Sequence, residues 1–166
     1  MTRLLVINGP AAVGKTTLCA TLAKHQPGCI NISGDALRWF APPDVKNHLG
    51  PGSTYKASAA LINAYTEMGA SLILFDYIFP TPQSFTGFVN MLSPEVTFHL
   101  FTLWAPLETV RAREAGRKER ERLGEQVIQT HQTLENNLDF FRQHGQILDN
   151  DAANPDHCIR LITQSL

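Results

Sequence analysis

The sequence predicts an α/β protein in which helices cover both faces of a parallel β-sheet. Five short apolar segments alternate with segments of helical spacing, and strands buried on both faces of a parallel sheet are apolar throughout. Strands separated by helices imply right-handed crossover connections. The chain has 166 residues, which is the size of one domain. We therefore expect a single domain over residues 1–166.

Glycine and proline mark the ends of the expected elements in the N-terminal half. Leu4–Ile7 is an apolar strand that ends at Asn8-Gly9-Pro10. Thr16–His25 is expected to be helical because Leu18 and Leu22 share one face. The same reasoning predicts a strand over Cys29–Ile32, a short helix with an irregular cap over 36–53, a helix over Thr54–Met68 and a strand over Leu72–Phe75.

Proline also marks the elements of the C-terminal half. Ala105-Pro106 ends the apolar strand Thr97–Trp104. Pro155 starts the closing helix Pro155–Ser165, since proline suits a first helical turn. The remaining expected elements are a short helix over Pro82–Met91, a charged helical stretch from Leu107 to about His144 and a strand over Gly145–Leu148.

Composition excludes several classes of protein. The 14 basic and 15 acidic residues give a net charge of −1, so no overall basic field attracts a long nucleic acid. The apolar runs are far shorter than the roughly 20 residues of a membrane span, and the N-terminus lacks a secretory cleavage pattern. Three cysteines are odd in number and lack metal-ligand spacing. We therefore expect a cytoplasmic protein with free, buried thiols.

A complete phosphate-binding motif follows the first expected strand. Residues 9–16 match G-x-x-x-x-G-K-[ST] between a strand and a helix, as the motif requires. Its N–H groups and the helix N-terminus bind phosphate oxygens. We expect Lys15 to reach the β- and γ-phosphates and Thr16 to ligate Mg²⁺. The expected nucleotide-binding residues are Gly9, Pro10, Ala11, Ala12, Val13, Gly14, Lys15, Thr16 and Thr17.

Two carboxylates follow expected strands, at the sheet edge where ligands of parallel sheets bind. Asp35 either takes a proton from an acceptor hydroxyl during phosphoryl transfer or caps a helix. Arg38, one turn later, either faces the same site or is a solvated surface arginine. Asp76 ends an apolar strand and either binds Mg²⁺, binds the acceptor or caps the next turn.

An arginine-rich segment over about 107–124 is expected to form a lid. On a helix, Arg113, Arg117 and Arg120 share one face. Ala115-Gly116 interrupts the helix and makes the segment a candidate mobile lid, whose arginines stabilise charge on a transferring phosphoryl group. The alternative is a solvated helix with internal salt bridges.

Aromatic residues gather where an acceptor would bind. Nine of the 14 aromatic residues lie between residues 39 and 88, where cations are scarce. Phosphate-rich acceptors and nucleic acids need more cations than this, so a neutral, partly apolar molecule with a free hydroxyl fits best. The expected acceptor-binding residues are Asp35, Arg38, Trp39, Phe40, Asp76, Tyr77 and Phe79.

Several of these motifs together resemble the chloramphenicol phosphotransferase-like kinases. The resemblance rests on Gly9–Thr17, Gly34-Asp35-x-Leu37, Phe75-Asp76, Arg113-Glu114-x-x-Arg117-x-x-Arg120 and the ending Ile147-Leu148-Asp149 followed by Asn154-Pro155. It implies the three-layer P-loop kinase fold with sheet order 2-3-1-4-5. It also implies that Asp35 is the catalytic base, that Lys15 and Thr16 hold ATP and Mg²⁺, and that Arg113, Arg117 and Arg120 form the catalytic lid.

The resemblance predicts the reaction but not the acceptor. Gly124 stands one position late for the glycine after the lid arginines, and the segment Arg38–Tyr55 has no convincing match. The expected function is ATP-dependent phosphorylation of a hydroxyl on an antibiotic-like molecule or a metabolite, with antibiotic resistance as one outcome. Asp35 and Arg38 also resemble polynucleotide 5′-hydroxyl kinases, so that activity is the first alternative. A non-catalytic nucleotide-binding regulator is the second.

Overall fold

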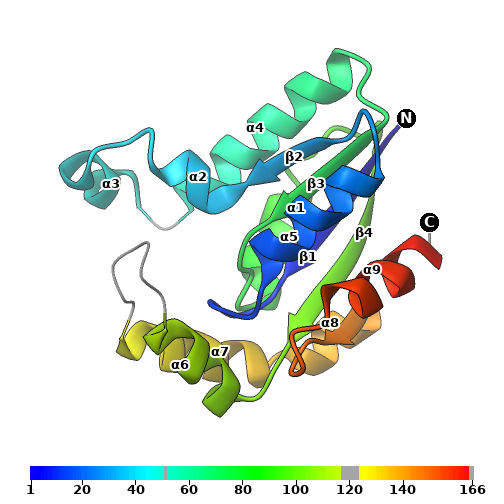
Figure 1. Ribbon diagram of the computed structural model, residues 1–166. Coiled ribbons are helices and arrows are strands. Elements are labelled where there is room, and N and C mark those ends of the chain that lie inside the picture. The colour runs from blue at the N-terminus through cyan, green and yellow to red at the C-terminus, as the bar shows by residue number, and fades with distance from the viewer. Residues whose placement is uncertain (51, 117–123, 165–166) are drawn as a thin grey trace.

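A five-stranded parallel sheet forms the centre of the molecule (Figure 1). This computed structural model describes residues 1–50, 52–116 and 124–164. Within these ranges the spatial order of the strands is β2-β3-β1-β4-β5, and each neighbouring pair is parallel. The order confirms the expected P-loop kinase fold. The strands are β1 (Thr2–Asn8), β2 (Ile30–Ser33), β3 (Leu72–Asp76), β4 (Val96–Trp104) and β5 (Gln146–Asp149).

The helices lie close to the positions that the sequence predicts. Segment 36–53 contains two short helices, α2 and α3, in place of one. The capping box of α5 explains its start, because Ser84 N donates to Thr81 Oγ1 at 3.2 Å. The helices are α1 (Lys15–His25), α2 (Gly34–Arg38), α3 (Pro43–Leu49), α4 (Ser53–Glu67), α5 (Pro82–Val89), α6 (Leu107–Ala115), α7 (Glu125–Glu135), α8 (Leu138–His144) and α9 (Pro155–Gln164).

Helices cover both faces of the sheet, which gives the expected three layers. On one face, α1 and α9 bury Leu18, Leu22 and Ile162 against the sheet. On the other face, α4, α5 and α8 contribute to a second core that contains Ile62 and Phe88. Alternate side chains of β1 enter the two cores, and all of its apolar residues from Leu4 to Ile7 are fully buried. This double burial explains why the strand is apolar throughout.

The charged helical stretch from Leu107 to about His144 is broken at two places. α6 ends at Ala115 with Gly116 as its C-cap, where the sequence predicts an interruption. A second break separates α7 from α8 at Asn136 and Asn137. The amide of Asn137 donates to the carbonyl of Thr133 at 2.7 Å, which ends α7 with a side-chain bond. Leucine and phenylalanine periodicity continues through the break, so the sequence did not reveal it.

The buried amide of Asn8 links the end of β1 to β4 and to the segment after β3. Asn8 Nδ2 donates to the Phe79 carbonyl and to Thr102 Oγ1, each at 3.3 Å. The Phe79 N–H donates back to Asn8 Oδ1 at 2.8 Å. These bonds hold the segment after β3 against the end of β1, beside the phosphate-binding loop. Over the same described ranges, no helix has the length and apolar character of a membrane span.

Candidate active site

The phosphate-binding loop connects the end of β1 to the start of α1. Gly9 and Gly14 have φ angles of 145° and 107°, which glycine adopts without a steric penalty. A Cβ atom at Gly9 would lie 2.5 Å from the Leu103 carbonyl oxygen, so the loop packs directly on β4. Gly14 is the left-handed N-cap of α1. The first turn of α1 therefore presents its unpaired N–H groups at this loop.

Lys15 and Thr16 place a cation and a hydroxyl at the loop. Lys15 Nζ donates to the carbonyl oxygens of Gly9 and Pro10, each at 2.9 Å, so the ammonium lies against the loop. Thr16 Oγ1 donates to Asp76 Oδ1 at 3.1 Å. Asp76 is the last residue of β3 and is only 3% exposed. The C-terminal end of β3 and the first turn of α1 therefore bring a buried carboxylate next to a threonine hydroxyl.

This pair of oxygen ligands fits Mg²⁺ that arrives with a nucleotide. Mg²⁺ prefers oxygen ligands and is commonly bound by one or two carboxylates together with substrate phosphates. Among residues 1–50, 52–116 and 124–164, no group of three or more His, Cys, Asp or Glu side chains is arranged to hold a metal. Thr16 and Asp76 offer one hydroxyl and one carboxylate, a donor set that would suit a Mg²⁺ ion shared with nucleotide phosphates.

Burial controls the ionisation of Asp76. Desolvation raises the pKa of the Asp76 carboxyl, and the nearby Asp35 raises it further. The Lys15 ammonium and hydrogen bonds from Thr16 and Ser33 act in the opposite direction, but the pKa remains above its usual value. The folded state therefore binds a proton at Asp76 more readily than the unfolded state does. As the pH rises from the pKa of the unfolded state through the raised pKa of the folded state, Asp76 ionises and the protein loses stability.

Asp76→Asn is expected to raise the Tm at neutral pH and to weaken Mg²⁺-dependent ATP binding. The amide removes the buried charge but still accepts the Thr16 hydrogen bond. The Tm difference from wild type is expected to shrink at acid pH, where Asp76 is protonated. Thermal unfolding across pH, with ATP titrations with and without Mg²⁺, checks both effects. A lower Tm for the variant at neutral pH would contradict the conclusion that the buried Asp76 charge destabilises the folded protein.

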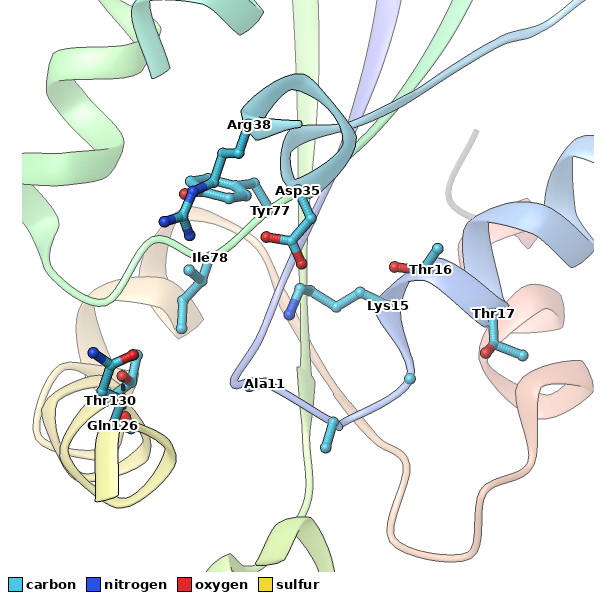
Figure 2. Close-up of a pocket in the computed structure, with 12 residues that line it drawn as sticks. Ala11, Lys15, Thr16, Thr17, Asp35, Arg38, Tyr77, Ile78, Gln126 and Thr130 are labelled. Atoms are coloured by element: carbon cyan, nitrogen blue, oxygen red, sulfur yellow. Dashed lines mark hydrogen bonds between the residues drawn. The ribbon is translucent and has the colours of Figure 1, made fainter. Parts of the chain in front are cut away.

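A cavity of about 220 Å³ brings the loop and two other elements together. Asp35 and Arg38 line it from α2, and Tyr77 lines it from the segment after β3. Figure 2 shows the Asp35 carboxylate and the Lys15 ammonium turned toward the same space. The other lining residues are Ala11, Ala12, Gly14, Thr16, Thr17, Ile78, Gln126 and Thr130. The cavity therefore joins the candidate base to the candidate phosphate site.

A second cavity of about 300 Å³ adjoins the first, because Arg38, Tyr77 and Ile78 line both. Its walls come mainly from α2, from α4 and from the segment after β3, and most of the lining residues are apolar or small. A Cβ atom at Gly34 would lie 2.4 Å from the Tyr77 ring, so glycine before Asp35 lets that ring pack here. The other lining residues are Leu37, Ala41, Leu49, Gly50, Ser53, Thr54, Tyr55, Ala57 and Pro80.

Tyr55 fixes the boundary between the two cavities. Its hydroxyl donates to the Ile78 carbonyl at 2.7 Å. Burial, with a contribution from Tyr77, raises the pKa of Tyr55 to about 12. The hydroxyl therefore remains a neutral donor at physiological pH and holds Ile78 in place.

Four predicted acceptor residues do not line either cavity: Trp39, Phe40, Asp76 and Phe79. Trp39 and Phe40 follow α2 and are 75% and 86% exposed. Phe79 is fully buried and stacks on Tyr55 at a ring-centroid distance of 5.0 Å. Phe79 follows Asp76 by three residues but does not reach the site, because its ring enters the second core. Phe79 is thus a core residue.

The expected lid arginines have different outcomes. Arg113 lies on α6, and its guanidinium donates to the carbonyls of Asn150 at 2.9 Å and Asp151 at 2.6 Å. It also reaches the Val13 carbonyl of the phosphate-binding loop at 3.5 Å. Arg113 therefore joins this loop to the segment between β5 and α9. Arg117 and Arg120 lie outside the described residues.

Sequence reasoning missed the polar side chains that α7 contributes. Gln126 and Thr130 line the first cavity and lie four residues apart on one face of α7. Figure 2 shows them across the cavity from Asp35 and Lys15. Their spacing was visible in the sequence, but only the tertiary fold shows which face of α7 points at the loop. The apolar lining of the second cavity had no local signal at all.

Comparisons with known proteins identify the same fold. A sugar kinase from Janibacter sp. HTCC2649 has a TM-score of 0.75 and 18% identity, covering 99% of this chain and 94% of that chain. The tunicamycin resistance protein of Deinococcus radiodurans has a TM-score of 0.72 and 20% identity, covering 99% and 95%. The Pnkp1/Rnl/Hen1 RNA repair complex has a TM-score of 0.70 and 16% identity, covering 84% of this chain and 46% of that chain.

The family comparison covers most of the sequence. None of the curated proteins matches the chain significantly. A family model described as an AAA domain matches residues 4–140, which include the phosphate-binding loop, both candidate carboxylates and α7. The chain therefore belongs to this AAA domain family, and its architecture is the P-loop kinase fold.

Proposed function

We propose that the protein is an ATP-dependent phosphotransferase that transfers the γ-phosphoryl group to a hydroxyl of a small molecule. One observation carries the proposal: Lys15 and Thr16 line the same cavity as Asp35. A nucleotide-binding regulator needs the phosphate-binding loop but no carboxylate facing it. A kinase needs both, since the acceptor hydroxyl must reach the γ-phosphate and a proton acceptor together.

The site residues divide the reaction between them. Asp35 accepts the hydroxyl proton as the acceptor oxygen forms its bond to the γ-phosphorus, and the bond from phosphorus to the bridging oxygen breaks to release ADP. Lys15 neutralises charge on the β- and γ-phosphates. Thr16 and Asp76 would hold Mg²⁺ together with the nucleotide, and the ion would supply further charge neutralisation. Arg117 and Arg120, the two expected lid arginines outside the described residues, would add positive charge to the transferring group.

The second cavity supports an uncharged, partly apolar acceptor. It opens beside Asp35 through shared walls at Arg38 and Tyr77. Among the described residues that line the two cavities, Lys15 and Arg38 are the cations. These two cations are too few to neutralise an acceptor that carries several negative charges. Similarity to a tunicamycin resistance protein favours antibiotics as part of any acceptor screen.

Polynucleotide 5′-hydroxyl kinase activity is the second candidate function. Arg38 lies one helical turn after Asp35 and lines the same cavity, and an RNA repair complex shares the fold. A bound strand, however, uses a cationic track along its backbone. The cations of the described cavity walls do not extend beyond Lys15 and Arg38, which favours a small acceptor.

Mass spectrometry after incubation with ATP and Mg²⁺ tests the proposal. The acceptor pools are a cell metabolite extract, an antibiotic collection and a 5′-hydroxyl oligonucleotide. We expect a small molecule to gain one phosphate, and the same product to be absent with Asp35→Asn. Phosphate on the oligonucleotide alone would assign the rival activity. ATP binding without a product from any pool would instead support a regulator.

A further inference from the structure

Asn150, directly after β5, is a buried amide that contacts the phosphate-binding loop. It is 7% exposed, and its Nδ2 donates to the Val13 carbonyl at 2.7 Å. Its backbone N–H donates to the Trp104 carbonyl at 2.8 Å, which fixes the residue beside β4. Residues 13 and 150 are far apart in sequence, so this contact depends on the fold. The proposed reaction gives Asn150 no role.

The loop needs a partner at this carbonyl. A loop that turns its N–H groups toward an anion turns carbonyls outward, and buried carbonyls need donors. Val13 is fully buried, so water does not reach it. Its neighbours Ala12 and Gly14 have φ angles of 61° and 107°, so the Val13 peptide lies between two left-handed residues. The Asn150 amide therefore holds the part of the loop whose conformation is least favoured locally.

Other contacts fix the Asn150 amide in one orientation. Its Oδ1 faces the buried Cys158 thiol, with Sγ to Oδ1 at 4.0 Å, which leaves Nδ2 directed at the loop. A Cβ atom at Gly14 would lie 2.9 Å from this Nδ2, so the amide packs directly on the loop backbone. The Arg113 guanidinium binds the Asn150 carbonyl at 2.9 Å and also reaches the Val13 carbonyl at 3.5 Å, so it supports the contact between Asn150 and the loop. Asn150 is thus held by α6, α9 and β4 while it contacts the loop.

We propose that Asn150 is a positioning residue for the phosphate-binding loop. Its amide fixes the Val13 peptide so that the N–H groups that follow are directed at a triphosphate chain. The inference rests on the nucleotide binding of the proposed function and is independent of the acceptor. Because Asn150 acts on the phosphates through the loop, its loss is expected to weaken the binding of inorganic tripolyphosphate as strongly as the binding of ATP.

Calorimetry of full-length Asn150→Ala with Mg²⁺ and either ATP or inorganic tripolyphosphate tests this role. Both ligands are expected to bind about tenfold more weakly than to wild type, the effect of losing one hydrogen bond to a buried carbonyl. Hydrogen exchange of the amides of residues 11–16 is expected to be faster without ligand. Asn150→Asp is expected to lose at least as much affinity, because a carboxylate donates no hydrogen bond to Val13 and repels phosphate.

Asn154→Asp is the matched control on the same segment. Asn154 is exposed, and its Oδ1 accepts the His157 N–H at 3.2 Å. Aspartate keeps that acceptor and adds the same charge as Asn150→Asp, so the affinity for tripolyphosphate is expected to stay within about twofold of wild type. Thermal unfolding identifies a variant that does not fold, in which case Asn150→Ser replaces Asn150→Ala.

Two outcomes would overturn the inference. One is wild-type affinity of Asn150→Ala for tripolyphosphate. The other is a loss confined to ATP, which would mean that Asn150 contacts the nucleoside and not the loop. Failure of the wild-type protein to bind ATP or tripolyphosphate would contradict nucleotide binding itself, so the two failures are distinguishable.

Discussion

Asp35→Asn is expected to slow phosphate transfer by about 10²–10⁴-fold, the usual effect of removing a general base. The amide keeps the size of the side chain but does not take the acceptor proton. ATP affinity is expected to stay near wild type, because the loop residues that hold the phosphates are unchanged. Steady-state turnover on the acceptor found by mass spectrometry, together with ATP titration, separates these effects.

Asp44→Asn is the matched control for Asp35→Asn. Asp44 is exposed in the first turn of the neighbouring helix α3 and lines neither cavity. Its substitution removes the same charge and is expected to leave turnover unchanged. Wild-type turnover of Asp35→Asn on the true acceptor would remove Asp35 from its proposed role, whatever the control shows.

Lys15→Ala is expected to lower turnover by about 10²-fold or more, like the loss of a preorganised donor to the transition state. The ammonium already lies at the loop through its bonds to the carbonyls of Gly9 and Pro10. Its removal takes one positive charge away from the site of the β- and γ-phosphates. Affinity for ATP is also expected to fall, so both kcat and KM for ATP are measured.

Lys24→Ala provides the control on the same helix. Lys24 is exposed in the last turn of α1, far along the helix from the loop. It is expected to have wild-type turnover and ATP affinity. Normal turnover in Lys15→Ala would refute the assignment of Lys15 to the β- and γ-phosphates.

The sequence predicted the sheet because the strands and the loop are local features. Leu4–Ile7 is apolar throughout as a strand buried on both faces requires, and observed β1 extends it to Thr2–Asn8. The phosphate-binding motif is contiguous in sequence, so its spacing alone specified the loop between β1 and α1. Asp76 could be placed at the loop because the carboxyl ends of parallel strands meet at one edge.

Local motifs predicted most of the wall of the first cavity. The rest of the cavity walls could not be predicted, because they depend on tertiary packing. Phe79 and Tyr77 are two residues apart and similar in character, yet Phe79 enters the aromatic core and Tyr77 lines both cavities. Arg113 was expected to face a transferring phosphate as part of a lid, and its guanidinium binds carbonyls of the segment after β5. Only the fold brings that segment to α6.

Isothermal titration calorimetry of the wild-type protein with ATP and Mg²⁺ tests the central claim, that residues 9–16 bind a triphosphate chain. The structure predicts saturable binding that weakens when Mg²⁺ is omitted and when Lys15 is replaced by alanine. Measurement at two temperatures avoids a condition at which the binding enthalpy is zero. The absence of heat from both ATP and GTP with Mg²⁺, at both temperatures, would contradict the account.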